Sequence, residues 1–335
     1  MKIWRSLLLA AVSVLILAVV SCSPSASQGL TQQTPNAPGV QAPRTYQDVI
    51  IGFAQLGAES EWRSANTKSI KETADALGIE LRFYDAQQKQ DNQIKAVRSL
   101  IVQKVDVIGI SPNVESGWEQ VFQEAKDAGI PIILVDRRAT VPDDLYRAYL
   151  GSDFVEEGRN AARVLANLVN GKANIVELVG TVDSAPANDR YKGFREVLKN
   201  YPEMKIIDSQ SGDFTRAKGK EVMEGFLKQY GKEITAVFSH NDDMSLGAIE
   251  AISEYGLKPG VDIKIVSVDA SHGAFEAMIA GTLNATVECN PLLGPQFFEL
   301  ALKVINGENV PKWVPSNEGI FFPDNAREEL PNRKY

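Results

Sequence analysis

The chain has 335 residues, which is more than one compact core usually holds, so its length predicts two domains. A hydrophobic content of 44% and a charged content of 23% are typical of a globular protein. The net charge of −8, with no stripe rich in Lys and Arg, argues against a nucleic-acid partner but leaves a small neutral ligand open.

The first predicted element, residues 1–22, has the anatomy of a secretory signal peptide. Two basic residues, Lys2 and Arg5, precede an apolar run over 7–20 that is too short to span a bilayer comfortably. The run ends in "VVSC", which resembles the lipobox of bacterial lipoproteins. This resemblance implies export to the periplasm or cell envelope and lipidation of Cys22. An ordinary signal peptide with a chance cysteine is the alternative.

Residues 23–45 are predicted to be a disordered tether. They are rich in Ser, Gln, Pro and Ala and carry one charge, Arg44, so they cannot bury a core. A flexible chain of this length reaches roughly 25 Å, enough to lift a domain clear of a membrane surface. With Cys22 lipidated, Cys289 has no disulfide partner, and hydrophobic cores must stabilise the fold.

From Asp48 onward, apolar runs alternate with helical patterns. The predicted strands are 49–54, 79–85, 105–112, 130–136, 147–153, 174–180, 204–210, 234–240 and 262–269. The predicted helices are 61–77, 92–103, 116–128, 155–170, 188–200, 215–229 and 243–255. This alternation predicts an α/β fold with right-handed crossovers, and the continuous Val/Ile/Leu runs predict parallel strands buried on both faces.

The pattern repeats at a coarser level. "VDVIGISPN" (105–113) is echoed by "ITAVFSHND" (234–242), and "GIPIILVDRR" (129–138) by "GVDIKIVSVDAS" (260–271). Each of these strands ends in Asn or Asp. Because ligands bind beyond the carboxyl ends of strands in open parallel sheets, the echo predicts two doubly wound, Rossmann-like halves that face a shared cleft.

The tail of the chain is predicted to visit both halves. A strand at 283–291, a helix at 293–307 and a last strand at 319–324 follow the second half. A chain that returns late to both halves crosses between them more than once, so we expect a hinge of several strands.

The sequence contains no enzyme motif. Gly52 and Gly57 follow the first strand without forming a dinucleotide fingerprint, and P-loop and nucleophile-elbow motifs are missing. His240 and His272 have no metal-ligand spacing, so neither a cofactor nor a metal is expected. A glycoside hydrolase that uses Glu59 with Asp136 remains as an alternative.

A sugar site requires carboxylate, amide and guanidinium groups to bind hydroxyls, and an aromatic plane. Such residues occur at comparable places in both halves. They are Trp62, Arg63, Asp136, Arg137, Arg190, Asn241 and Asp269. Five of them have a structural alternative: Trp62 as packing, Asp136 and Asn241 as caps, and Arg63 and Arg190 as exposed helix residues. Arg138 is not assigned to the site; it is interpreted as either a solvated neighbour or an ion-pair partner.

Several long motifs together resemble the periplasmic sugar-binding proteins of ABC importers, in the type I, ribose/galactose-type branch. The motifs are "GFAQLGAESEWR", "DAQQKQDNQIKAVRSLI", "ILVDRR", "SQSGDFTRAKGKEVME", "SHNDDMSLGAIEAI" and "VSVDAS". The resemblance covers about 49–330 and implies two lobes, joined by a three-crossover hinge, that close on a ligand. It places the lobes at 46–152 plus 291–316 and at 153–290 plus 317–335.

The resemblance also implies the ligand and its contacts. Within the branch, galactofuranose-binding members are the most similar; ribose, arabinose and galactopyranose are alternatives. The implied ligand-binding residues are Glu59, Trp62, Arg63, Asp136, Arg137, Arg190, Phe214, Asn241 and Asp269. Ribose-type members often carry Gln near 288–290, where this chain has Glu288, Cys289 and Asn290, so this wall of the pocket stays undecided.

The implied partners are an ABC permease and, through the N-terminal lipid alone, a membrane; the implied state is a monomer. Presentation of the ligand to a chemoreceptor or sensor kinase is an alternative that the residues do not exclude. A transcriptional repressor with the same fold is disfavoured, because no helix-turn-helix precedes Val49 and the export signal contradicts it.

Overall fold

The computed structural model describes residues 42–335. The predicted signal peptide, Cys22 and most of the predicted tether therefore lie outside the described residues. Arg44, which was assigned to the tether, is part of the fold: its guanidinium donates to Asp106 Oδ2 (2.9 Å) and its backbone N–H to Asn306 Oδ1 (2.8 Å). Among the described helices, none combines the length and apolar character needed to cross a membrane.

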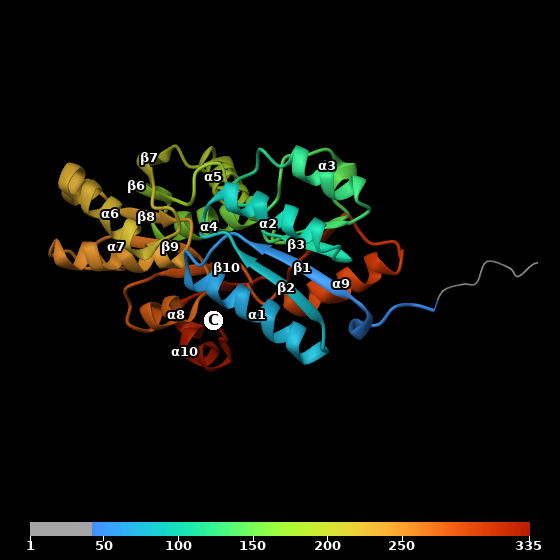
Figure 1. The fold of residues 1–335 in the computed structure, drawn as a ribbon. Helices are drawn as coiled ribbons and strands as arrows, with labels where there is room; N and C mark the ends of the chain where they lie inside the picture. The colour runs from blue at the N-terminus through green and yellow to red at the C-terminus, as the bar shows by residue number, and fades with distance from the viewer. Residues whose placement is uncertain (1–41) are drawn as a thin grey trace, which may run out of the picture. The chain divides into compact units, whose positions relative to one another are not determined.

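The N-terminal lobe is built on a six-stranded sheet with the order β11-β5-β4-β3-β1-β2, in which all neighbours are parallel (Figure 1, right). Its strands are β1 (Ile50–Gln55), β2 (Glu80–Asp85), β3 (Val107–Ile110), β4 (Ile132–Val135), β5 (Ala148–Gly151) and β11 (Trp313–Pro315). Its helices are α1 (Glu61–Leu77), α2 (Gln90–Val102), α3 (Glu119–Asp127) and α9 (Gly294–Ile305).

The C-terminal lobe has a second six-stranded sheet, with the order β12-β10-β9-β8-β6-β7 (Figure 1, left). Its strands are β6 (Lys172–Val179), β7 (Glu203–Ser211), β8 (Ala236–Ser239), β9 (Lys264–Asp269), β10 (Ala285–Glu288) and β12 (Ile320–Phe321), of which β12 is antiparallel to β10. Its helices are α4 (Phe154–Leu168), α5 (Ala185–Leu198), α6 (Arg216–Tyr230), α7 (Asp242–Glu254), α8 (His272–Ile279) and α10 (Pro323–Glu329).

Each sheet is buried on both faces because successive side chains of a strand point to opposite sides. In β8, Phe238 packs into the core beneath α4 and α5, whereas its neighbour Val237 packs into the core beneath α6, α7 and α8. In β1, Phe53 likewise joins the core with α1 and α9, and Ala54 joins the core with α2 and α3. The prediction of two doubly wound parallel sheets is confirmed.

Three elements differ from the sequence prediction. α8 and β11 were not predicted, and the strand predicted over 319–324 is only two residues long. Pro323 begins α10 instead of ending that strand. Proline is favoured at the first helical position because its missing N–H would have no partner there in any case.

The chain crosses between the two sheets three times: after β5, after β10 and after β11. Glu318 ties these crossovers together. Its Oε1 accepts hydrogen bonds from the Ser316 hydroxyl (2.7 Å), the Asn290 backbone N–H (3.3 Å) and the Ser152 hydroxyl. One carboxyl group thus fixes the three connecting segments to one another.

Candidate functional site

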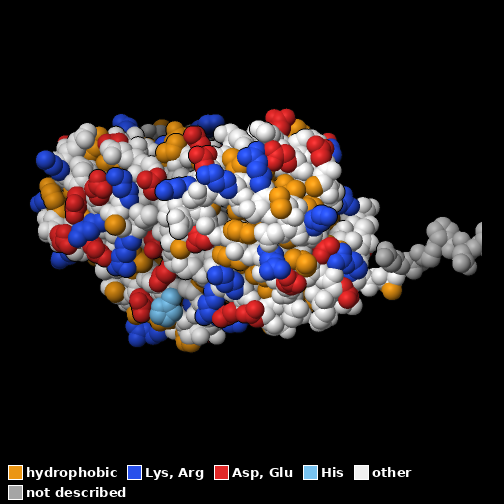
Figure 2. Space-filling view, in the orientation of Figure 1, with side chains coloured by type: hydrophobic (Ala, Val, Ile, Leu, Met, Phe, Trp, Pro, Cys, Tyr) orange, Lys and Arg blue, Asp and Glu red, His pale blue; other side chains and the backbone are white. Residues whose placement is uncertain are grey.

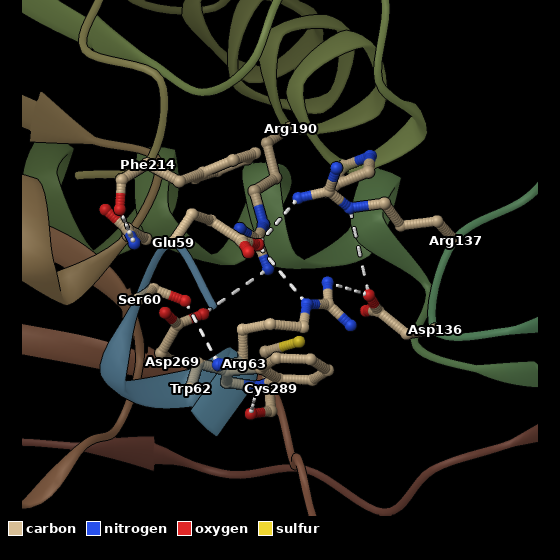
Figure 3. A pocket seen from close by; sticks show the side chains of 12 residues that line it. Glu59, Ser60, Trp62, Arg63, Asp136, Arg137, Arg190, Phe214, Asp269 and Cys289 are labelled. Atoms are coloured by element: carbon tan, nitrogen blue, oxygen red, sulfur yellow. Dashed lines mark hydrogen bonds and ion pairs between the residues drawn. The ribbon is translucent and has the colours of Figure 1, made fainter. Parts of the chain in front are cut away.

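Residues that follow strand ends in both lobes line one cavity, with an empty volume of about 280 Å³ (Figure 3). The lining residues are Glu59, Ser60, Trp62, Arg63, Asp136, Arg137, Pro186, Arg190, Phe214, Asn241, Asp269 and Cys289. The fold therefore brings all of the predicted ligand-binding residues together; their contacts with a ligand remain a prediction.

Arg63 organises the N-terminal half of the site. Ser60 caps α1 by accepting a hydrogen bond from the Arg63 N–H (3.1 Å), so the guanidinium starts from a rigid first turn. The guanidinium donates to Asp136 Oδ2 (2.5 Å), Glu59 Oε1 (3.2 Å) and Ser111 Oγ (3.3 Å). Two carboxylates from separate loops are thereby held by one cation.

Arg137 extends this network toward the other lobe. It donates to the Asn113 carbonyl oxygen (3.0 Å) and to Glu59 Oε1 (3.3 Å), and its guanidinium lies 5.3 Å from the ring centroid of Phe214. Two buried atoms here have no hydrogen-bond partner among the described residues: Arg137 Nε and Glu59 Oε2. Because buried polar groups are normally paired, a donor–acceptor group such as a hydroxyl would satisfy both.

Arg190 occupies the equivalent position in the C-terminal lobe. It donates to Glu157 Oε2 (2.6 Å) and to the His240 carbonyl oxygen (2.6 Å). Its Nη2 lies 3.7 Å from Asp269 Oδ1, too far for a hydrogen bond. Among the described residues, no side chain donates a hydrogen bond to the carboxyl of Asp269, so both of its oxygens can accept one from a ligand.

Several site residues have an unusual backbone conformation. The φ angles of Asp136, Phe214 and Asp269 are 64°, 61° and 126°, a region that few residues other than Gly, Asn and Asp adopt. The Phe214 ring packs directly on Gly180, where an added Cβ would lie 1.9 Å from the ring. Asn241 holds this loop by donating from Nδ2 to the Phe214 carbonyl oxygen (3.0 Å).

Two of the structural alternatives are settled by burial. Arg63 and Arg190 are not exposed helix residues, because only 2% and 3% of their surfaces are accessible.

Asn241 does cap a helix, since its Oδ1 accepts from the Met244 N–H (3.0 Å), and it also lines the cavity. Trp62 lines the cavity while its indole N–H donates to the Cys289 carbonyl oxygen.

Sequence reasoning missed Ser60, Pro186 and Cys289 as lining residues, and Glu157 as the partner of Arg190. Cys289 lies in the segment that departs from the ribose-type pattern, so that departure was the available signal. Its neighbours turn away from the cavity: Glu288 binds Arg333 (2.6 Å), and the Asn290 side chain accepts from the Leu292 N–H (2.9 Å).

The lining carries three guanidinium groups and three carboxyl groups, so its formal charges balance. Burial raises the pKa of Asp269 well above its usual range, against the opposing charge of Arg190. Burial and the nearby charge of Arg63 lower the pKa of Arg137 to about 10. A balanced, desolvated lining favours a neutral polar ligand over a charged one.

Glu157 and Glu318 approach the lining residue Cys289 closely enough for the three to be considered as metal ligands. The Arg190 cation already binds Glu157, and hydroxyl and N–H donors occupy Oε1 of Glu318. Burial raises the pKa of both carboxyls, that of Glu157 to about 8. We therefore interpret the cluster as one that retains a proton at neutral pH.

This cluster predicts how stability depends on pH. A Glu157 carboxyl with a pKa of about 8 keeps its proton in the folded state at pH values where the unfolded chain releases it. The unfolding free energy should then fall as pH rises from about 4.5 to about 8, by about 1.4 kcal/mol for each unit of pKa difference at most. In thermal melts between these pH values, the Tm of Glu157→Gln should fall less steeply with rising pH than the Tm of the wild type.

Glu224→Gln, which changes an exposed glutamate of α6, is the matched control and should reproduce the wild-type slope. Parallel curves for Glu157→Gln and the wild type would show that Glu157 does not hold the proton.

Comparison with known proteins identifies the family. The family model described as a periplasmic binding protein domain matches residues 51–309. The galactofuranose-binding protein YtfQ of Escherichia coli (strain K12) is 50% identical over 291 residues, covering 85% of this chain and 92% of YtfQ.

Two solved structures are similar over nearly the same region. The periplasmic binding protein component of the arabinose ABC transporter from Shewanella sp. ANA-3, bound to α- and β-L-arabinofuranose, has a TM-score of 0.83 and 49% identity, covering 85% of this chain and 95% of that one. A Mycobacterium smegmatis protein in complex with β-D-fucofuranose has a TM-score of 0.84 and 51% identity, covering 86% and 95%. The chain belongs to the periplasmic binding protein domain family.

Proposed function

We propose that the protein is the monomeric sugar-binding component of an ABC importer, and that it binds a furanose, galactofuranose first among them, between its two lobes. The observation that carries this proposal is the charge-balanced cavity whose polar groups come from both lobes. A ligand that bridges the lobes binds the closed arrangement better and shifts the population toward it. A permease would recognise that arrangement.

The relatives support the choice of ring form. The proteins at about 50% identity are named for galactofuranose, or were solved with arabinofuranose or fucofuranose. More distant relatives, at 30–32% identity, are named for fructose and ribose. The relatives named for galactofuranose, arabinose, fructose and ribose are all named as binding proteins. In this chain Glu59 and Asp136 both accept hydrogen bonds from Arg63, so the two carboxylates share one cation.

Calorimetric titration of the purified protein with galactose, L-arabinose, ribose and methyl β-D-galactopyranoside tests the proposal. Galactose and arabinose solutions contain furanose forms and should bind, with apparent affinities reduced by the furanose fraction. The methyl pyranoside cannot change its ring and should not bind. Equal responses to galactose, ribose and the pyranoside, or no response to any sugar, would overturn the assignment.

We further propose that the two lobes that move are formed by residues 46–152 plus 291–316 and by residues 153–290 plus 317–335. We also propose that Cys22 is lipidated and anchors the protein. The apolar run that ends in "VVSC" motivates the anchor. Cells that express Cys22→Ser should release the protein into the soluble envelope fraction, whereas the wild type stays with the membranes. Equal partitioning of the two forms would contradict lipidation.

On the face shown in Figure 2, basic and acidic side chains are interspersed. A nucleic-acid-binding surface would gather basic residues in a stripe. The surface charge is thus consistent with a protein whose ligand is a small molecule.

A further inference from the structure

Arg138 follows the two site residues Asp136 and Arg137, yet it does not line the cavity. Its guanidinium instead forms an ion pair with the carboxylate of Asp189, which lies on α5 of the other lobe next to Arg190. The pair joins the segment after β4 to a helix of the C-terminal lobe, so it bridges the two lobes without contacting the sugar site.

A second set of contacts lies beside this pair. The side-chain amide of Asn188 donates to Glu115 Oε2 (2.7 Å), and the Glu115 N–H donates to the Asp183 carbonyl oxygen (2.9 Å). Glu115 belongs to the segment between β3 and α3, and Asn188 and Asp183 belong to α5 and the loop before it. Two loops of one lobe thus bind one turn of the other.

None of these residues belongs to the three crossover segments. Those segments contain Ser152, Asn290 and Ser316, which are all hydrogen-bonded to Glu318. The crossovers hold the lobes together in any arrangement, because they are covalent. Contacts between loops of different lobes exist only while the lobes are close together. They therefore contribute to the difference in free energy between the closed and the open arrangement.

We propose that Arg138 and Asp189, supported by Glu115 and Asn188, form a closure latch that retains the bound sugar. The inference rests on the proposed function. A ligand's affinity is reduced by the fraction of protein that is not in the binding-competent arrangement, so residues that favour closure strengthen binding without touching the sugar. Arg138 and Asp189 are positioning residues in this sense.

The expected size of the effect follows from exposure. The side chains of Arg138 and Asp189 are 35% and 15% accessible, so solvent partly screens the pair. Ion pairs of this kind change an equilibrium by about two- to fivefold. Because the pair exists only in the closed arrangement, whereas the sugar enters and leaves through the open one, its loss should speed opening. The release rate should therefore rise, with little change in the association rate.

Stopped-flow tryptophan fluorescence tests the latch, because Trp62 lines the cavity and should report on binding. With galactose as the probe, Arg138→Ala and Asp189→Ala should each release sugar about two- to fivefold faster than the wild type. The double variant Arg138→Asp with Asp189→Arg should recover much of the lost retention. The difference should shrink in 1 M NaCl, where charges are screened within roughly 3 Å.

Arg98→Ala is the matched control. Arg98 pairs with Glu124 (2.8 Å) inside the N-terminal lobe, and its side chain is 46% accessible, so its removal should leave the release rate unchanged. Single variants that release sugar at the wild-type rate, or a charge swap that restores nothing, would overturn the latch while sugar binding itself still stands.

If the wild type binds none of the sugars, the proposed function fails. The latch is then tested separately, by measuring the radius of gyration of the empty protein with small-angle scattering. A larger radius of gyration for Arg138→Ala than for Arg98→Ala would support it. Equal radii would overturn it.

Discussion

Asp269→Ala is expected to weaken galactose binding by more than about 100-fold while leaving the Tm of the empty protein nearly unchanged. Within residues 42–335, the only polar contact of the Asp269 carboxyl is a 3.7 Å ion pair with Arg190, so its two oxygens are available to adjacent hydroxyls. Each sugar hydroxyl that loses its partner in the cavity costs roughly 1–3 kcal/mol, so the loss of two partners reaches about two decades in affinity. Calorimetric titration and thermal melts measure the two quantities.

The empty protein should tolerate the change because Arg190 keeps its bonds to Glu157 and to the His240 carbonyl oxygen. Asp269→Asn, which keeps the volume and one acceptor oxygen, should give an intermediate loss of affinity. A large fall in Tm for Asp269→Ala would instead assign this residue to the stability of the lobe.

Arg190→Ala is expected to abolish binding and also to destabilise the empty protein by at least about 2 kcal/mol, because two buried acceptors lose their donor. From the sequence alone, this substitution would be expected to leave stability intact, as for Asp269. The structure changes that expectation, because Arg190 is buried and its removal strands the Glu157 carboxyl and the His240 carbonyl oxygen. Urea denaturation measures the change in unfolding free energy.

The double variant Arg190→Ala with Glu157→Gln should recover part of the stability and none of the binding. Arg159→Ala is the control on the adjacent helix: its ion pairs with Glu156 and Glu196 are partly exposed, so its removal should cost no more than about 1 kcal/mol. An Arg190→Ala protein as stable as Arg159→Ala would show that Arg190 has no structural role.

The arrangement of strands and helices was predictable because the parallel strands are buried on both faces and read as continuous apolar runs. α8 and β11 were not, for different reasons. α8 follows β9 after only two residues, so no turn marks its start beyond Ser271, which caps it. β11 has three residues and ends in Pro315; its place is set by pairing with β5 and not by its own sequence.

The positions of the site residues followed from topology, whereas their partners did not. Arg63 pairs with Asp136, 73 residues away, and Arg190 with Glu157, 33 residues away. Helical periodicity describes only which face of a helix a side chain occupies, and a charged residue on a helix is usually exposed. Burial of both arginines depends on carboxylates that other segments deliver, which only the folded structure reveals.

The left-handed backbone at Asp136, Phe214 and Asp269 determines where the sugar preference of this scaffold can be redesigned. Strain of this kind costs about 1–3 kcal/mol per residue, and the surrounding fold bears that cost. Asn and Gly tolerate such angles, but branched side chains do not. Engineering for a different ring or side arm therefore has the widest choice of substitutions at Trp62 and Cys289, whose backbone imposes no such limit.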